Sequence, residues 1–226
     1  MLVHEIFDSL SGEIDGFGGQ GKPTTFIRLQ GCNLPRGCAY CDSKETHQSF
    51  NRGRELTLAA VMSYVTMPKV IITGGEPLVQ YNDVVELVRL FSALITPVTI
   101  ETNGSIVVPH NFIGPNYYVA RKAYLRIVMD YKLPRSGMED YMEPAAFMEL
   151  YPWDVIKFVI DGDVDYARMK ELLSNNMWRA QIVISPSFGG MEDLPSAQVL
   201  AQKMLDDPDL RNAQFSLQMH KLLGVK

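Results

Sequence analysis

The feature that most constrains the fold of this chain is a regular alternation of short apolar segments with amphipathic ones. Segments rich in β-branched and aromatic residues predict strands at residues 25–30, 69–73, 97–101, 125–131, 154–160 and 180–185. Helix-like segments lie between them, at residues 56–65, 82–93, 164–173 and 194–205, and a short last strand is expected at 214–219. Strands that alternate with helices in this way form βαβ units and a parallel sheet.

The length of the chain predicts an incomplete barrel. A closed barrel of eight βα units typically needs about 250 residues, whereas this chain has 226 residues and fewer such units. We therefore expect an α/β fold in which parallel strands, with helices outside, form a partial, laterally open TIM-like barrel. No linker or internal repeat interrupts the pattern, so a single domain over residues 1–226 is expected.

Charge and hydropathy argue against several classes of protein. The chain has 21 Lys and Arg against 26 Asp and Glu, a formal net charge of −5, so no basic excess points to nucleic acid or to an anionic membrane. The apolar runs are only as long as strands, which argues against a transmembrane helix. The first residues lack the cationic and apolar regions of a secretory signal, and a cytoplasmic location is expected.

The three cysteines, Cys32, Cys38 and Cys41, lie within ten positions. An odd number so closely spaced is a poor disulfide framework, and clustered thiols in a reducing compartment usually serve metal or redox chemistry. With His47 as a fourth ligand they could hold a structural zinc ion. Alone they could hold a [4Fe–4S] cluster with one iron left open. A thioredoxin-like pair would leave Cys32 without a role. The cysteines by themselves leave zinc and iron–sulfur both open.

Unusual polar residues gather where the predicted strands end. The carboxyl ends of parallel strands meet at one rim, and α/β barrels bind their ligands there. Turn chemistry explains the Gly and Pro residues in these clusters, but it does not explain Glu76, Glu101 and Lys132. The clusters are the cysteine loop and residues 74–77, 101–104, 130–137, 161–162, 185–187 and 218–221. The functional site is therefore expected at this rim.

The cysteine loop, with Tyr40 before the third cysteine, and Gly74-Gly75-Glu76-Pro77 together resemble the radical S-adenosylmethionine (SAM) superfamily. In that superfamily three cysteines bind a [4Fe–4S] cluster, and the Gly-Gly-Glu-Pro stretch contacts the methionine amine of SAM. The resemblance implies that the reduced cluster cleaves SAM to a 5′-deoxyadenosyl radical, which abstracts a hydrogen atom from the substrate. No side chain of the protein is then expected to be the abstracting group.

Further matches, which span nearly the whole chain, resemble the 7-carboxy-7-deazaguanine synthases, ring-contracting lyases of queuosine and 7-deazapurine biosynthesis. The matching segments are residues 4–13, 26–34, 41–43, 101–104, 130–134, 157–159 and 216–221. The resemblance implies conversion of 6-carboxy-5,6,7,8-tetrahydropterin to 7-carboxy-7-deazaguanine with loss of ammonia, with SAM used catalytically and Mg²⁺ assisting. It also implies a homodimer and an electron donor such as flavodoxin.

The resemblance also implies site residues, position by position. Cys32, Cys38 and Cys41 would bind the cluster, and Ser43, where the family has Thr, would bind Mg²⁺. Arg28 would pair with the substrate carboxylate. The residues expected around SAM are Tyr40, Cys41, Asp42, Gly74, Gly75, Glu76, Pro134, Arg135 and Ser136. The residues expected around the pterin are Leu10, Ser11, Gly12, Glu13, Arg28 and Thr73.

Two departures from the family pattern bear on the substrate. Five residues, 33–37, separate the first two cysteines where the family has three, and Ser11 replaces a common Gln. Loop insertions of this kind are thermodynamically mild, whereas the loss of an amide removes a group able to recognise the edge of a pterin. Two alternatives stay open: another radical SAM enzyme, such as a glycyl-radical activase, and a non-catalytic zinc-binding module.

Overall fold

The structure, a computed structural model, describes residues 1–17, 19–47, 52–109, 112, 122–188 and 193–225. Its strands are β1 (Leu2–Leu10), β2 (Pro23–Leu29), β3 (Arg54–Glu55), β4 (Val70–Gly74), β5 (Val98–Thr102), β6 (Leu125–Tyr131), β7 (Val155–Ile160), β8 (Gln181–Pro186) and β9 (Gln214–Phe215). They form one sheet in the order β3-β1-β2-β4-β5-β6-β7-β8-β9. From β2 to β9 neighbouring strands are parallel, whereas β1 is antiparallel to both β2 and β3.

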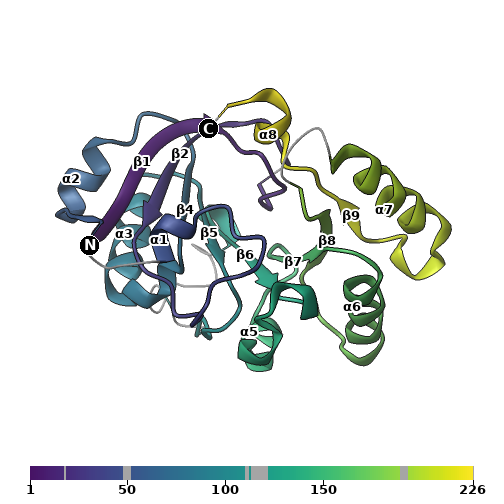
Figure 1. Ribbon diagram of the computed structural model, residues 1–226. Helices are drawn as coiled ribbons and strands as arrows, with labels where there is room; N and C mark the ends of the chain where they lie inside the picture. Colours follow the sequence, from purple (N-terminus) through teal and green to yellow (C-terminus); the bar gives the residue numbers. More distant parts are fainter. Residues whose placement is uncertain (18, 48–51, 110–111, 113–121, 189–192, 226) are drawn as a thin grey trace.

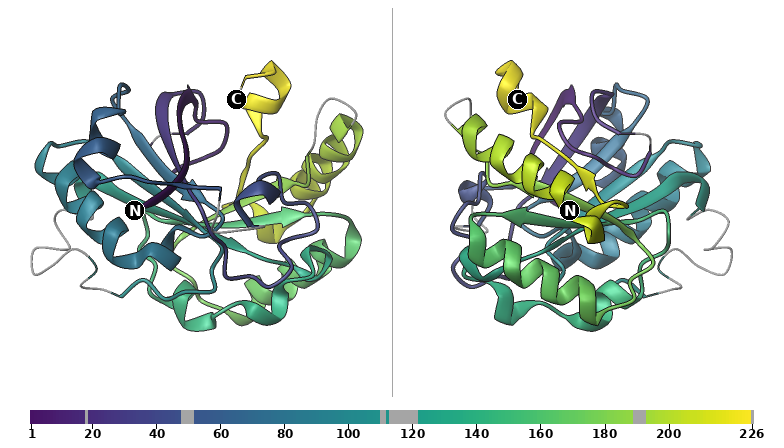
Figure 2. Two further views of the ribbon diagram at one scale, coloured as in Figure 1. Left: turned by 60° about the vertical axis from the view of Figure 1, so that its left-hand side comes forward. Right: turned by 90° about the vertical axis from the view of Figure 1, so that its right-hand side faces the viewer.

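The sheet curls into an arc whose outer side is covered by helices (Figures 1 and 2). These are α2 (Leu58–Ser63), α3 (Tyr81–Ala93), α5 (Pro144–Met148), α6 (Asp163–Asn175) and α7 (Leu194–Asp206). Other helical segments are α1 (Lys44–His47), α8 (Met219–Leu223), η1 (Pro77–Gln80), η2 (Pro134–Ser136), η3 (Glu139–Tyr141) and η5 (Pro208–Leu210). The edge strands β3 and β9 do not pair with each other, so the barrel is open.

The predicted α/β fold with a partial, open barrel of parallel strands is confirmed. The six main predicted strands correspond to β2 and to β4 through β8. Some details were wrong. The strands β1 and β3 were not predicted, and the last strand ends at Phe215, after which the chain turns and forms α8. The region 106–123, expected to be a loop, lies partly outside the described residues.

The main core lies between the sheet and its outer helices. Alternate residues of β2, such as Ile27 and Leu29, are fully buried on the helix side. Helix α3 buries Leu87, Val88 and Phe91 against this face. Each such side chain contributes about 1.5–3 kcal/mol relative to exposure, so this layer holds the strands in place and leaves their inner face available for a site.

The connection between β1 and β2 fills the lower part of the barrel interior. Ile14, in this connection, packs on a small cluster separate from the main core, formed by Val128, Val155 and Val183 on the inner face of β6, β7 and β8. We call residues 11–17 the plug loop. Because it occupies the interior, the plug loop closes the barrel beneath the rim where the strands end.

Charged side chains anchor the plug loop. Asp15 forms an ion pair with Lys69, and the side chains are 2% and 5% exposed, respectively. The guanidinium of Arg126 lies 4.2 Å from the ring centroid of Phe17, in cation–π geometry. A buried ion pair of this kind depends on both partners being present, so these contacts fix where the loop can lie.

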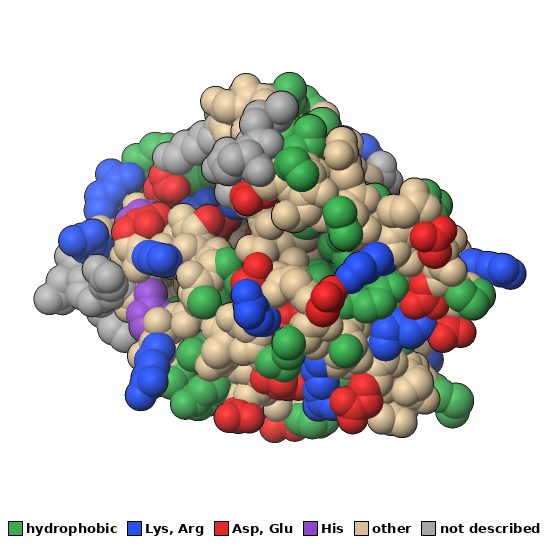
Figure 3. Space-filling view, turned by 45° about the vertical axis from the view of Figure 1, so that its right-hand side comes forward, with side chains coloured by type: hydrophobic (Ala, Val, Ile, Leu, Met, Phe, Trp, Pro, Cys, Tyr) green, Lys and Arg blue, Asp and Glu red, His purple; other side chains and the backbone are tan. Residues whose placement is uncertain are grey.

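The surface carries both signs of charge. On the face drawn in Figure 3, acidic and basic side chains are interspersed. None of the helices in the described residues is long and apolar enough to cross a membrane.

Candidate active site

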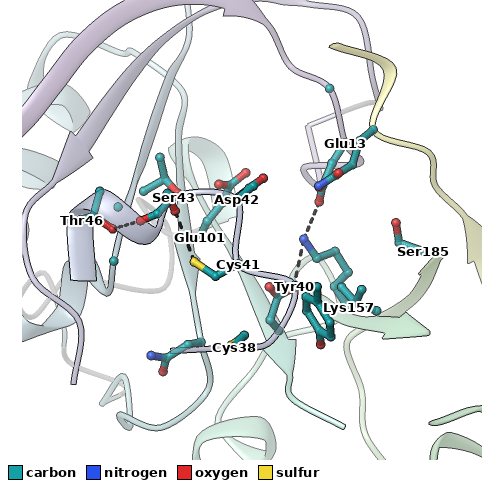
Figure 4. Close-up of a pocket in the computed structure, with 18 of the residues that line it drawn as sticks. Glu13, Cys38, Tyr40, Cys41, Asp42, Ser43, Thr46, Glu101, Lys157 and Ser185 are labelled. Atoms are coloured by element: carbon teal, nitrogen blue, oxygen red, sulfur yellow. Dashed lines mark hydrogen bonds and ion pairs between the residues drawn. The ribbon is translucent and has the colours of Figure 1, made fainter. Parts of the chain in front are cut away.

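A cavity of about 680 Å³ opens at the carboxyl ends of β2 and of β4 through β8. It is the rim where the sequence predicted a site. The cysteine loop lies on one side of the cavity and Glu13 and Ser185 lie on the other (Figure 4). The plug loop forms part of its floor through Gly12 and Glu13. Side chains from segments far apart in the sequence therefore meet in one cavity.

The three cysteines are free thiols that all line this cavity. They are partly buried, and Cys41 donates its backbone N–H to the carbonyl of Cys38 at 3.0 Å, which makes a tight turn around Tyr40. Burial raises the pKa of Cys32 and of Cys38, and the nearby charge of Cys41 raises both further. Thiols in such a place are best stabilised as thiolates by a bound metal centre.

The geometry differs from that of a mononuclear zinc site. Among the described residues, no three His, Cys, Asp or Glu side chains come close enough together to hold a single metal ion. The Nε2 atom of His47 is hydrogen-bonded to the carbonyl of Leu34. The zinc site of three cysteines and His47 is therefore not formed in the described structure. In a [4Fe–4S] cluster each thiolate binds a different iron atom, so the three sulfurs need not meet at one point. The donor set fits such a cluster.

Gly74 and Gly75 allow two strand ends to come together. A Cβ atom on Gly74 would lie 2.3 Å from the carbonyl oxygen of Leu29, and one on Gly75 would lie 2.1 Å from the carbonyl oxygen of Gly31. Next to them, the N–H of Glu76 donates to the carbonyl of Gly31 at 2.7 Å. The end of β4 thus packs directly under the start of the cysteine loop, which only residues without a Cβ permit.

Glu76 ties β4 to β5 from a fully buried position. Its carboxylate accepts hydrogen bonds from the backbone N–H groups of Leu78 and Asn103 and from the hydroxyl of Thr102, at 2.7–2.9 Å. Burial raises the pKa of Glu76 to about 7, although these hydrogen bonds lower it. The carboxylate therefore holds the rim together, and it does not line the cavity.

Four charged side chains alternate in sign along the cavity wall. Lys157 lies 2.5 Å from Glu13 and 3.1 Å from Asp130, and Lys132 lies 2.7 Å from the other oxygen of Asp130. Burial by itself would lower the pKa of Lys157, but the carboxylates of Asp130 and Glu13 outweigh it and raise the pKa well above its usual value. The charges of these four side chains therefore balance one another.

The structure brings most of the predicted site residues to the cavity. Those that line it are Leu10, Gly12, Glu13, Arg28, Cys32, Cys38, Tyr40, Cys41, Asp42, Ser43, Thr73, Gly74 and Gly75. Those that do not are Ser11, Glu76, Pro134, Arg135 and Ser136. Ser11 is 1% exposed, and its backbone pairs with that of Lys22 and Gly21. The turn at 134–136 touches the cysteine loop through one bond, from the N–H of Ala39 to the carbonyl of Ser136 at 3.0 Å.

Several cavity residues were absent from the predicted site. They are Glu101, Asn103, Asp130, Lys132, Lys157, Ser185, Gln218, His220 and Lys221. Most belong to the clusters of polar residues that the sequence analysis placed at the ends of the predicted strands. Lys157 is the exception because it lies outside those clusters, and a lysine in the apolar run Val155–Ile160 was a usable signal.

Comparison with known proteins agrees with this geometry. Residues 26–112 match the model of the radical SAM superfamily. A 7-carboxy-7-deazaguanine synthase of Methanospirillum hungatei is 33% identical over 100% of this chain and 86% of its own length. That of Clostridium acetobutylicum is 36% identical over 98% and 95%. The crystal structure of QueE from Escherichia coli superposes with a TM-score of 0.71 at 23% identity, over 97% of this chain and 94% of that one, which shows the shared fold.

The partial barrel and its cysteine-lined cavity are those of a radical SAM enzyme, a class whose members hold a [4Fe–4S] cluster and SAM. Within that class, the chain belongs to the family of the 7-carboxy-7-deazaguanine synthases.

Proposed function

We propose that this chain converts 6-carboxy-5,6,7,8-tetrahydropterin to 7-carboxy-7-deazaguanine with release of ammonia. The observation that carries the proposal is that one cavity holds three free thiols on one side and a fixed carboxylate, Glu13, on the other. The full-length relatives named 7-carboxy-7-deazaguanine synthase support the same reaction. Such a cavity has room for a cofactor and a small heterocycle together.

The cofactor end is formed by the cysteine loop and the end of β4. Cys32, Cys38 and Cys41 would hold the cluster, and SAM would lie against the backbone of Gly74 and Gly75. When bound, the cluster and SAM supply the radical that abstracts a hydrogen atom from the substrate. Tyr40 and Asp42 line the same side of the cavity. Glu76 and the turn at 134–136 would support this end from behind, because the N–H of Glu76 donates to the carbonyl of Gly31 and the carbonyl of Ser136 accepts from the N–H of Ala39.

The substrate end is formed by β1, β2, β4 and the plug loop. Arg28 points its guanidinium toward Glu5, with Nε 3.0 Å from Oε1, and over the ring of Phe7 at 5.6 Å. It would pair with the substrate carboxylate, for which a guanidinium has matching geometry. Glu13 would accept hydrogen bonds from the pterin ring, and Leu10, Gly12 and Thr73 line the same cavity. Ser11 does not line the cavity and would act only through the backbone of the plug loop, which it pairs with Lys22 and Gly21. These residues bind and orient the substrate and exclude water.

Ser43 would contribute to a Mg²⁺ site. Its hydroxyl oxygen lines the cavity and lies 3.9 Å from the sulfur of Cys41. The carboxylate of Asp42, the preceding residue, is half exposed in the same wall. Oxygen ligands of this kind, completed by water and substrate oxygens, are what Mg²⁺ prefers.

The remaining features of the proposal follow the family resemblance. The chain would act as a single domain over residues 1–226, as a homodimer, in the cytoplasm. An electron donor such as flavodoxin would reduce the cluster, and neither nucleic acid nor membrane would be a partner. The net charge of −5 supports the last point.

Product analysis tests the proposal. The chain, reconstituted with iron and sulfide without oxygen, is incubated with SAM, Mg²⁺, dithionite and 6-carboxy-5,6,7,8-tetrahydropterin. We expect 7-carboxy-7-deazaguanine by mass spectrometry. Formation of 5′-deoxyadenosine without that product would favour another radical SAM reaction. The non-catalytic alternative is tested before reconstitution: a protein that, purified without oxygen, is colourless and contains zinc but neither iron nor sulfide would support it.

A further inference from the structure

Lys157 differs from the other lysines of the cavity because its ammonium group joins two carboxylates. Its Nζ atom lies 2.5 Å from Oε2 of Glu13 and 3.1 Å from Oδ1 of Asp130. The side chain is only 10% exposed, and it projects from the apolar strand β7. A buried ammonium ion loses its hydration, and partners such as these must compensate for the loss. The two carboxylates therefore hold the ammonium group of Lys157 in place.

Glu13 receives contacts from segments far apart in the sequence. Besides the ammonium of Lys157 on one oxygen, its other oxygen accepts a hydrogen bond from Nε2 of Gln218 at 2.6 Å. The plug loop that carries Glu13 is itself held below by Ile14. A carboxylate has about four acceptor positions. Two are used here, so a carboxylate of fixed orientation remains available on the cavity side.

We propose that Lys157 is a positioning residue that fixes the carboxylate of Glu13 for the substrate. This inference rests on the proposed function, because it takes Glu13 as a group that binds the pterin. The amino and ring N–H groups of a pterin are adjacent donors, and a carboxylate that is held in one orientation accepts both. If the carboxylate rotated freely, its ordering on binding would cost conformational entropy and would reduce the affinity for the pterin.

Asp130 makes the position of Lys157 independent of any ligand. Its second oxygen, Oδ2, lies 2.7 Å from Nζ of Lys132. Burial by itself would raise the pKa of Asp130, but the two lysines outweigh it and lower the pKa. Asp130 therefore stays ionised, and it holds the ammonium of Lys157 on the side away from Glu13. The row Glu13, Lys157, Asp130 and Lys132 thus extends from the substrate end toward the cofactor end.

Binding of a stable analogue tests this role without turnover. The probe is 6-carboxypterin, the oxidised and fluorescent form of the proposed substrate, titrated into protein loaded with cluster and SAM. Lys157→Met removes the charge and keeps most of the bulk, and we expect it to weaken binding of the analogue about 10-fold or more. Lys157→Arg keeps the charge and should restore a large part of that loss. The matched control is Lys170→Met, which removes a lysine paired with Asp207 and Asp209 outside the cavity.

A double-mutant cycle separates positioning from a general effect on the fold. If Lys157 acts through Glu13, the double variant Glu13→Gln/Lys157→Met should have about the same affinity for the analogue as whichever single variant binds it less tightly. Full additivity of the two losses would overturn the proposal. So would unchanged binding by Lys157→Met, or a loss of SAM affinity as large as the loss of analogue affinity.

Two further readouts keep the test decisive. With active enzyme, Lys157→Met should raise KM for the tetrahydropterin more than it lowers kcat, and the reverse would contradict the proposal. If Lys157→Met does not fold, Asp130→Asn releases Lys157 from one carboxylate. It should then weaken analogue binding about 3-fold or more, and unchanged binding would overturn the proposal. Failure of the proposed function is a different result, in which the wild-type enzyme forms no deazaguanine product.

Discussion

Gly75 lies so close to Cys32 that a Cβ atom on Gly75 would be 2.9 Å from the Cβ atom of Cys32. The end of β4 is therefore part of the support of the first cluster ligand. From the sequence, Gly74 and Gly75 were expected only as residues around SAM. In the structure they first leave space for the backbone of β2 and the cysteine loop, and the ligand surface of the cavity is built on that contact.

Gly75→Ala should displace Cys32 and lower the iron content of the reconstituted protein. The added methyl group would also lie 2.1 Å from the carbonyl oxygen of Gly31, so the loop must move. Overpacking of this kind costs about 1–3 kcal/mol. Iron and sulfide analysis measures the effect. Gly162→Ala is the control, since it strains a left-handed glycine with open space around it, far along the chain from the cysteines. Equal iron content in the two variants would contradict the prediction.

Ser43→Ala should weaken the response of the enzyme to Mg²⁺ while the cluster stays intact. The hydroxyl is the part of Ser43 that a hard cation would bind, and we expect the Mg²⁺ concentration for half-maximal activity to rise about 10-fold or more. Ser43→Thr keeps a hydroxyl and should respond like the wild type. An unchanged Mg²⁺ response in Ser43→Ala would remove Ser43 from the metal site.

Lys69→Met should destabilise the fold through the plug loop. The variant leaves the carboxylate of Asp15 buried without its partner, which costs about 3–5 kcal/mol. Urea unfolding of the cluster-free chain gives the change in the free energy of unfolding. Arg89→Met, which breaks the exposed pair of Arg89 with Glu86, should cost at most about 1 kcal/mol. Recovery of stability in Asp15→Leu/Lys69→Met would confirm the cause, and a Lys69→Met variant as stable as Arg89→Met would exclude it.

The buried carboxyl of Glu76 should make stability depend on pH. Burial raises the pKa of Glu76 to about 7, whereas in an unfolded chain a glutamate has a pKa of about 4.3. Between these values the folded protein binds more protons than the unfolded chain. The free energy of unfolding should therefore fall as the pH rises from about 4.5 to about 7. Urea unfolding across this range should show the slope in the wild type, and Glu76→Gln should lose this part of it. Equal slopes would show that Glu76 does not titrate there.

The parallel part of the fold could be predicted because buried parallel strands are continuous apolar runs. β4, with Val70, Ile71 and Ile72, is such a run. β1 is different. Its residues include His4, Glu5 and Asp8, most of the strand is only partly buried, and it has no regular apolar period. β1 is a strand because it pairs with the edge of β2, and β2 is held in place by the rest of the sheet.

The site was predictable in its residue types and in its location at the strand ends, but not in its contacts. Lys157 and Glu13 are 144 positions apart, and no local pattern joins them. The same holds for Asp15 and Lys69, which meet because the plug loop folds into the barrel. Such pairs depend on the tertiary arrangement, which periodicity and motif spacing do not contain.

The central claim is that Cys32, Cys38 and Cys41 hold an iron–sulfur cluster with one iron open to SAM. Electron paramagnetic resonance of the reduced, anaerobically reconstituted protein tests it most directly, with and without SAM. The account predicts a [4Fe–4S]⁺ signal that changes when SAM is added and that is absent from Cys32→Ala. A protein without that signal, or with a signal that SAM leaves unchanged, would contradict it.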